Sequence, residues 1–285
     1  MDESSQIMQA QQDALAAIRA DVSATQRLIG EEALTESLLS VYEGNEPFLK
    51  QLENNLLPAY SHFRTVRGDG ICFYRSLCLS FALALRRGGV ALGGEPRTHL
   101  QKGYDFTLEK VASLCSRLQV YGFSELLSDF TDALLDYLKG LSDPVISEEV
   151  ACIEPLDRSG GLGDSILYGL RLCTALELLE DPEQMGYSMF VEGAFGLDVR
   201  SWVDTCVLPS FEEADNIQIL AVARFLGIKI SIASIDAHNY HINSLPDASE
   251  ELRRVGDDEA AAKALRALPI HLLLRPGHYD LLTPR

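Results

Sequence analysis

The stretch from Cys72 to Leu85 constrains the fold more than any other part of this chain. Its sequence, CFYRSLCLSFALAL, is apolar around nearly the whole circumference of a helix. A surface helix keeps one polar face, so a helix of this composition is expected to be buried at the centre of the molecule. Directly before it, Gly68-Asp69-Gly70 has the residues of a tight turn. We therefore predict a turn that leads into a central helix, around which the rest of the chain packs.

Helical patterns dominate most of the chain, and strand patterns are concentrated near its C-terminus. The predicted helices cover residues 6–29, 32–42, 46–57, 107–120, 123–139, 144–151, 165–180, 199–206, 214–226 and 257–267. Period-two alternation and β-branched residues, clearest in IKISIASI, predict strands. The predicted strands cover residues 228–235, 238–245, 270–274 and 278–282, with one short extended piece earlier, at 63–66. This order indicates an α/β (α+β) fold in which many helices precede a small sheet formed late in the chain.

No internal repeat and no long linker divides the sequence. We expect residues 1–30 to form an N-terminal helical arm and residues 31–285 to form a single domain. The apolar side of the arm is weak and chain termini are often poorly ordered, so a frayed segment is an equally good interpretation of residues 6–29.

The chain is acidic, with 24 Lys and Arg residues against 42 Asp and Glu residues and a net charge of −18. Nucleic acids and anionic membranes need a concentrated cationic surface, so neither is expected as a partner. The N-terminus has no signal-peptide pattern, and no stretch reaches the roughly 18 apolar residues of a membrane span. The six cysteines form no CxxC pair and no zinc spacing. We expect a reducing location, cytoplasmic and also nuclear, and no metal site.

Cys72 differs from the other cysteines because it follows the glycine turn and begins the apolar helix. The N-terminus of a helix presents unpaired N–H groups and a partial positive charge, both of which stabilise a thiolate. The same N–H groups could hold the oxyanion of a tetrahedral intermediate. These features make Cys72 a candidate nucleophile. A buried structural cysteine at the start of a helix is the alternative that the segment by itself leaves open.

A nucleophilic thiol needs a base, and His278 is the best placed of the six histidines. It follows Pro276-Gly277 and begins a predicted strand. In a strand, residues i and i+2 point to the same face, so Asp280 is expected to lie beside His278 and to orient its imidazole. An ordinary surface pair is the alternative. His271, inside an apolar strand, is expected to be structural.

Two motifs give the sequence a family resemblance. The pattern G-D-G-x-C-F-Y-R, from Gly68 to Arg75, and the pattern R-P-G-H-Y-D-L-L, from Arg275 to Leu282, resemble the OTU superfamily of deubiquitinating cysteine proteases, and within it the otubains. Two further stretches, Val207-Leu208-Pro209 with 213–219 and Phe190-Val191-Glu192-Gly193, are also similar to the family. The similarity extends from about residue 36 to the C-terminus.

The resemblance implies a papain-like OTU fold with a mostly antiparallel sheet, and it implies cleavage of isopeptide bonds after the ubiquitin C-terminus. The substrate would be polyubiquitin joined through the lysine best known for proteasomal targeting. Cys72 would be the nucleophile, His278 the general base and Asp280 its orienting acid, while Asp69 would shape the oxyanion loop. No cofactor would be needed, and the protein would be a monomer. The residues that would bind substrate are Gly70, Ile71, Phe190, Glu192, Gly193 and Gly277.

The sequence departs from the family pattern at two positions. Ile71 stands where the family usually has Asn, between the glycine and the nucleophile, and Asn216 stands where otubains often have His. If backbone N–H groups do most of the work at the oxyanion, the change at Ile71 is a mild defect.

Two other functions fit parts of the sequence. An otubain-like surface could bind ubiquitin or a ubiquitin-charged conjugating enzyme without cleaving anything, with the arm touching the proximal ubiquitin. A general papain-like protease is disfavoured, because the C-G-S-C-W signature and a secretion signal are both missing.

Overall fold

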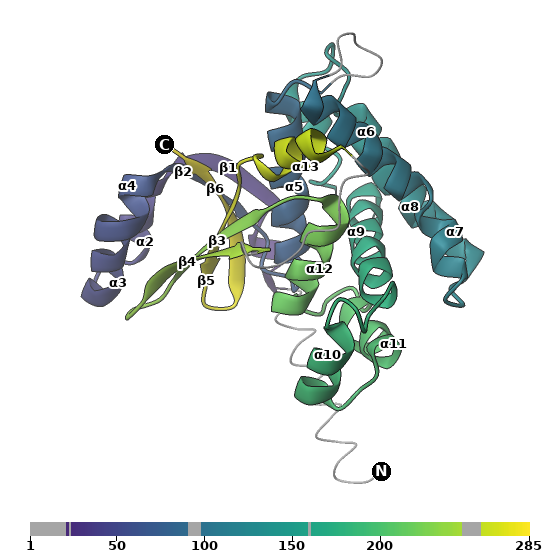
Figure 1. The fold of residues 1–285 in the computed structure, drawn as a ribbon. Coiled ribbons are helices and arrows are strands. Elements are labelled where there is room, and N and C mark those ends of the chain that lie inside the picture. Colours follow the sequence, from purple (N-terminus) through teal and green to yellow (C-terminus); the bar gives the residue numbers. More distant parts are fainter. Residues whose placement is uncertain (1–20, 23, 91–97, 159–160, 247–257) are drawn as a thin grey trace.

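One six-stranded sheet, in the order β1-β2-β6-β5-β3-β4, forms one side of the molecule (Figure 1). The computed structural model describes residues 21–22, 24–90, 98–158, 161–246 and 258–285. All neighbouring strands are antiparallel except β3 and β5, which are parallel. This mixed architecture confirms the predicted α/β fold class. The strands are β1 (Ile29–Leu34), β2 (Tyr60–Val66), β3 (Ile230–Ile235), β4 (Tyr240–Leu245), β5 (Ile270–Arg275) and β6 (His278–Pro284).

The sheet is larger than the sequence predicted, because β1 was not predicted as a strand and β2 extends the short piece that was predicted at 63–66. Residues 32–34 belong to β1, whereas a helix was predicted to begin there. Only Ile29 of β1 is buried, so the strand carries no alternating apolar signal. Its conformation is set by pairing with β2, where Ile29 lies opposite Val66. Tertiary pairing thus overrides the local pattern, as is common for edge strands.

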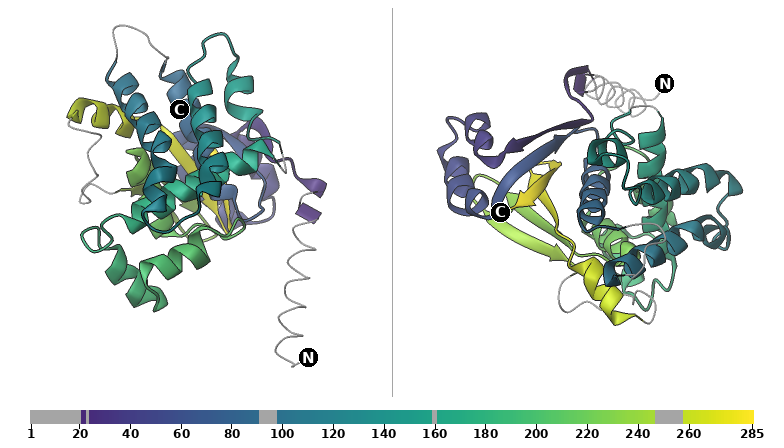
Figure 2. Two further views of the ribbon diagram at one scale, coloured as in Figure 1. Left: turned by 90° about the vertical axis from the view of Figure 1, so that its right-hand side faces the viewer. Right: turned by 90° about the horizontal axis from the view of Figure 1, so that it is seen from above.

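Helix α5 (Cys72–Arg87) is the predicted central helix, and residues 72–85 are all buried. It packs against β5 and β6 on one side and against α9 (Leu162–Leu179) on the other. Seen from above, α5 lies between the sheet and the main group of helices (Figure 2). The other helices of this group are α6 (His99–Ala112), α7 (Leu114–Gln119), α8 (Ser128–Gly140), α10 (Tyr187–Phe195), α11 (Val199–Trp202), α12 (Asn216–Leu226) and α13 (Glu259–Arg266).

Three short helices cover the opposite face of the sheet (Figure 2). They are α2 (Leu38–Val41), α3 (Glu46–Gln51) and α4 (Leu57–Ala59). Phe48 and Leu52 pack there against Leu273 and Leu282 of the sheet. The central strands of the sheet are therefore covered on both faces, whereas the edge strands β1 and β4 are largely exposed.

The predicted arm lies mostly outside the described residues, which begin at Asp21. Its last part does not behave as an appendage, because Leu28 and Ile29 are buried and β1 begins at Ile29. A boundary after residue 30 would therefore cut through a strand. Among the described residues, no helix is both long enough and apolar enough to span a bilayer.

Candidate functional site

His278 and Asp280 lie side by side at the start of β6, as the period of a strand requires. The His278 Nε2 atom is 2.8 Å from Asp280 Oδ1. A carboxylate can only accept a hydrogen bond, so Nε2 carries the proton of this contact and Nδ1 is the nitrogen left to face another group. The turn that presents His278 contains Gly277, whose φ of +70° favours glycine.

Asp280 is fully buried and has two partners besides His278. The backbone N–H of Val66 in β2 donates to its Oδ1 over 3.1 Å, and the Arg275 guanidinium donates to its Oδ2. Burial by itself would raise the pKa of this carboxyl. The hydrogen bond from His278 and the charge of Arg275 outweigh burial and hold the pKa below its usual value. Asp280 therefore stays ionised while it orients the imidazole.

Cys72 is the first residue of α5, and its thiol lies close enough to His278 to affect the pKa of the ring. Burial lowers the pKa of His278, but the interactions of its ring with Asp280 and Cys72 raise it to about 9. Asp280 therefore holds Nε2, which leaves Nδ1 as the ring nitrogen available to the thiol. The N–H groups in the first turn of α5 have no intrahelical acceptor, so this end of the helix can stabilise negative charge.

Asp69 shapes the turn before Cys72 through its side chain as well as through backbone geometry. Its Oδ1 accepts the N–H of Ile71 over 3.2 Å. Both of its oxygens bind the guanidinium of Arg75, each over 2.9 Å. Arg75 is buried one helical turn into α5. The ion pair therefore fixes the turn to the helix that carries the nucleophile.

The candidate residues fall into two groups in space. Ile71 and Cys72 belong to the main hydrophobic core, on which Tyr279 of β6 also packs. Phe190, Glu192 and Gly193 instead lie on α10, which packs in a second core around Trp202. Phe190 is 50% exposed. The structure brings Asp69, Gly70, Ile71, Cys72, Gly277, His278 and Asp280 together, and it places the three α10 residues on a separate surface.

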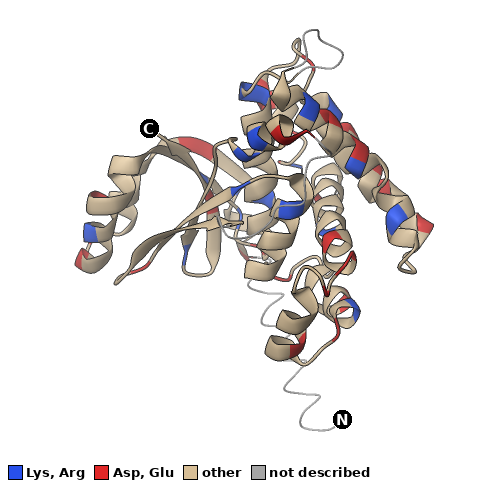
Figure 3. Ribbon diagram, viewed as in Figure 1, with Lys and Arg blue, Asp and Glu red and all other residues tan. Residues whose placement is uncertain are grey.

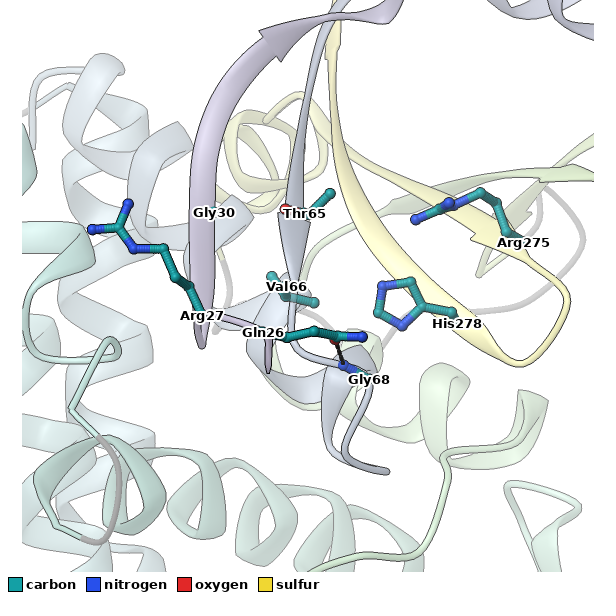
Figure 4. A pocket seen from close by; sticks show the side chains of 8 residues that line it. All are labelled: Gln26, Arg27, Gly30, Thr65, Val66, Gly68, Arg275 and His278. Carbon is teal, nitrogen blue, oxygen red and sulfur yellow. Dashed lines mark hydrogen bonds between the residues drawn. The ribbon is translucent and has the colours of Figure 1, made fainter. Parts of the chain in front are cut away.

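A pocket of about 440 Å³ opens beside His278 (Figure 4). One wall is the segment just before β1, which sequence analysis did not connect with the site. The Gln26 side-chain oxygen accepts the N–H of Gly68 over 3.2 Å, and Arg67 donates to the Gln26 carbonyl. No sequence signal marks this wall, because it depends on how β1 pairs with β2. The pocket is lined by Gln26, Arg27, Gly30, Thr65, Val66, Gly68, Arg275 and His278.

Basic and acidic residues are interspersed along the helices in Figure 3, and α6, for example, carries Lys102, Asp105, Glu109 and Lys110. This is unlike the continuous basic face that nucleic acids require. Within the described part of the chain, no group of three or more His, Cys, Asp or Glu side chains is arranged to hold a metal ion.

The model of the Peptidase C65 Otubain family matches residues 21–284. The chain belongs to the otubain family. Membership places it among cysteine peptidases, which confirms the class of enzyme predicted from the two motifs.

Named relatives agree with this assignment. The chain is 26% identical over 264 residues to "OVARIAN TUMOR DOMAIN-containing deubiquitinating enzyme 1" of Arabidopsis thaliana, covering 90% of this chain and 81% of the relative. It is 26% identical over 279 residues to "Ubiquitin thioesterase OTUB1" of Homo sapiens, covering 96% and 88%. A solved complex of h/ceOTUB1 with ubiquitin aldehyde and UBCH5B~Ub has a TM-score of 0.78 at 22% identity, covering 98% of this chain and 99% of the other. That structure shows that the fold is shared.

Gly70 and Gly277 of this otubain offer a matched pair of substitutions. Both have positive φ, of +85° and +70°. A Cβ at Gly70 would lie 2.4 Å from the Phe211 carbonyl oxygen, whereas nothing lies within 4 Å of one at Gly277. We expect Gly277→Ala to lower the free energy of unfolding by about 1–2 kcal/mol, the cost of the left-handed conformation. Gly70→Ala should lower it further, as measured by urea unfolding. Equal losses of stability in the two variants would show that the Phe211 backbone moves away from the added Cβ at no cost in free energy.

Proposed function

We propose that this otubain is a deubiquitinating cysteine protease that hydrolyses isopeptide bonds after the C-terminus of ubiquitin. The observation that carries the proposal is the position of His278, which is hydrogen-bonded to Asp280 and close enough to Cys72, at the start of α5, for the two groups to interact electrostatically. This is the order of groups that thiol catalysis needs. The names of the relatives, ubiquitin thioesterases and a deubiquitinating enzyme, support the same substrate.

The proposed reaction begins when the Cys72 sulfur, as thiolate, attacks the carbonyl carbon of the terminal glycine of ubiquitin. Free N–H groups at the start of α5 stabilise the resulting oxyanion. The protonated His278 then gives its proton to the leaving lysine amine, and the C–N bond breaks to leave a thioester on Cys72. His278 next takes a proton from water, which attacks the thioester. The C–S bond breaks, the ubiquitin carboxylate and the Cys72 thiolate are released, and the second proton of the water passes to solvent. Asp280 stays ionised throughout and holds the ring.

The proposed substrate is a lysine-linked ubiquitin chain of the proteasome-targeting type. The apolar side chains Met189 and Phe190 on α10, which are exposed, offer a surface for a folded ubiquitin, with Glu192 and Gly193 beside them. The tail of ubiquitin carries arginines, which suits the net charge of −18. All six cysteines are free thiols, and we propose a reducing, cytoplasmic location for the protein.

Two assays test the proposal together. A ubiquitin with a C-terminal electrophile should label Cys72, identified by mass spectrometry of the modified peptide. A panel of differently linked di-ubiquitins should then show cleavage of the proteasome-targeting linkage first. Labelling without cleavage of any linkage would contradict the chain substrate, and no labelling would contradict thiol catalysis on ubiquitin.

The pH dependence of the rate should have its alkaline limb near pH 9. The leaving amine needs the proton of His278, whose pKa is raised to about 9 by Asp280 and Cys72 against the opposing effect of burial. The charged imidazolium is therefore present below pH 9 and is lost as the pH rises through it. We expect kcat/KM for a fluorogenic ubiquitin C-terminal amide to fall there. An alkaline limb near the ordinary histidine value of about 6.5 would show that the ring is neutral in the free enzyme.

Two truncations separate recognition from chemistry at the N-terminus. A chain that begins at Asp21 keeps Gln26 and the buried Leu28, so we expect it to react normally with a mono-ubiquitin electrophile. Its KM for di-ubiquitin should rise, if the removed arm contacts the proximal ubiquitin. A chain that begins at Glu31 loses the pocket wall and part of β1, so both reactions should fail. Normal labelling of the shorter chain would show that residues 26–30 are dispensable to the site.

The second candidate function is binding of ubiquitin or a charged conjugating enzyme without cleavage. The observation that favours it is a set of structural neighbours, since the h/ceOTUB1 complexes contain UBC13~Ub and UBCH5B~Ub. Failure of the ubiquitin electrophile to label Cys72, together with retained binding to a conjugating enzyme charged with ubiquitin, would select this function.

A further inference from the structure

Arg171 on α9 is a buried cation whose partners are backbone carbonyls. Its side chain is 1% exposed. It donates to the carbonyls of Val207 over 2.7 Å, of Ser210 over 3.3 Å and of Glu212 over 2.7 Å. In the described chain no carboxylate lies within ion-pair distance of it. Burial of an unpaired guanidinium is costly. Its three bonds to one loop, residues 207–212, are the gain that offsets this cost.

The loop that Arg171 holds closes on the turn before the nucleophile. The Phe211 carbonyl oxygen is the atom that a Cβ at Gly70 would meet at 2.4 Å. Phe211 lies between Ser210 and Glu212, whose carbonyls both bind Arg171. The bonds to the residues before and after Phe211 therefore fix the position of its carbonyl. They also fix the space that Gly70 occupies.

The same guanidinium also contacts the nucleophile helix. It lies 4.6 Å from the centre of the Tyr74 ring, two residues after Cys72. The Tyr74 hydroxyl donates to Gln218 Oε1 of α12 over 3.0 Å, and the Gln218 amide donates to the Cys206 carbonyl over 3.1 Å. One buried polar network thus joins the first turn of α5 to Cys206, just before the loop, and through Arg171 to the loop itself.

We propose that Arg171 is a positioning residue for the cleavage reaction. By fixing the loop 207–212 against both Gly70 and Tyr74, it sets the orientation of the turn and of the first N–H groups of α5 relative to the Cys72 sulfur. Arg171 itself touches neither substrate nor the reacting atoms. The expected effect of Arg171 on the cleavage rate rests on the proposed function. Its expected effect on the conformational order of the turn at residues 68–70 rests on the polar network alone.

Kinetic measurements on Arg171→Met and Arg171→Lys test the role in catalysis. Methionine keeps the length and apolar stem but removes every donor, and lysine keeps the charge but not the planar fork. For a fluorogenic ubiquitin amide we expect kcat to fall about 10- to 100-fold in Arg171→Met, with KM changed less than about threefold. Arg171→Lys should recover part of the loss. The alkaline limb of the pH profile should stay where it is, because His278 and Asp280 are untouched.

Arg224→Met provides the matched control. Arg224 is another buried arginine, on α12, which bonds to the Tyr187 hydroxyl over 3.0 Å in the second core. Its replacement should lower thermal stability without changing kcat. A folded Arg171→Met or Arg171→Lys enzyme with the kcat of wild type would overturn the proposal. So would a loss of kcat in Arg224→Met equal to that in Arg171→Met, since any buried arginine would then have the same effect.

Hydrogen exchange tests the network independently of activity. In Arg171→Lys, peptides covering residues 68–74 and 207–212 should exchange faster than in wild type, while peptides of α10 should not change. Unchanged exchange at 68–74 would overturn the inference even if the wild-type protein cleaved no ubiquitin. Failure of wild type in the cleavage assay with the expected exchange would instead count against the proposed function alone.

Discussion

Cys72→Ala should abolish cleavage of ubiquitin conjugates, with a loss in kcat of at least about 10⁴-fold, because the attacking atom is removed. The change deletes a single sulfur atom from a buried position that is 5% exposed. The cavity is smaller than the one left when a leucine is truncated, so we expect the free energy of unfolding to fall by only about 1 kcal/mol. Cleavage of di-ubiquitin and urea unfolding, measured on the same preparation, separate the two effects.

Cys78→Ala is the matched control for that experiment. Cys78 lies in the same helix and is equally buried, but desolvation raises the pKa of its thiol far above the usual value. It cannot supply a thiolate near neutral pH. We expect this variant to lose similar stability and to keep full activity. If Cys72→Ala cleaved at the wild-type rate, or if Cys78→Ala were the inactive variant, the assignment of the nucleophile would be wrong.

Local patterns were sufficient to predict the central helix and the late strands, and they were insufficient for the start of the sheet. The apolar surface of 72–85 and the alternation of 228–235 are each strong within one element. Strand β1 buries only Ile29 and is fixed by its pairing with β2. A strand whose conformation comes from its neighbour carries no signal in its own sequence, and so residues 32–34 were predicted as helix.

The candidate site divides in the same way. His278 and Asp280 could be placed together from the sequence because they belong to one strand and differ by two residues. The Val66 N–H that also holds Asp280 comes from another strand and depends on the pairing of β2 with β6. Gln26 reaches Gly68 only because β1 pairs with β2. Contacts between segments that are distant in the sequence depend on the tertiary structure, so sequence motifs do not predict them.

Ile71 illustrates a departure whose meaning changes once the structure is known. Its side chain is buried in the main core and makes no capping bond to α5. The turn is held instead through the backbone N–H of Ile71, which donates to Asp69, and through the ion pair of Asp69 with Arg75. An apolar residue at this position therefore contributes to packing, and the geometry of the turn does not depend on a side-chain amide there.

Asp280→Asn should impair both catalysis and folding. The neutral amide orients His278 less well and no longer stabilises its charge, so we expect kcat to fall about 10²- to 10⁴-fold. The pKa of His278, raised to about 9 with the help of Asp280, should move down, and the alkaline limb of the rate should move with it. Arg275 would lose its carboxylate partner, which costs about 3–5 kcal/mol when a buried pair is broken. Urea unfolding and the pH profile of kcat/KM measure the two effects.

The double variant Asp280→Asn with Arg275→Met separates these two roles. Removal of the Arg275 guanidinium, which has lost its carboxylate partner, should restore much of the stability, because a buried ion pair can be replaced by apolar contacts at little cost. The rate should not recover, since His278 still lacks its carboxylate. In wild type the lowered pKa of Asp280 means that its contribution to stability is complete above its ordinary pKa and is lost as the pH falls through the lowered value. The double variant should lose this acid dependence. Recovery of the rate along with the stability would show that Asp280 acts on the fold alone and that Cys72 and His278 work as a dyad.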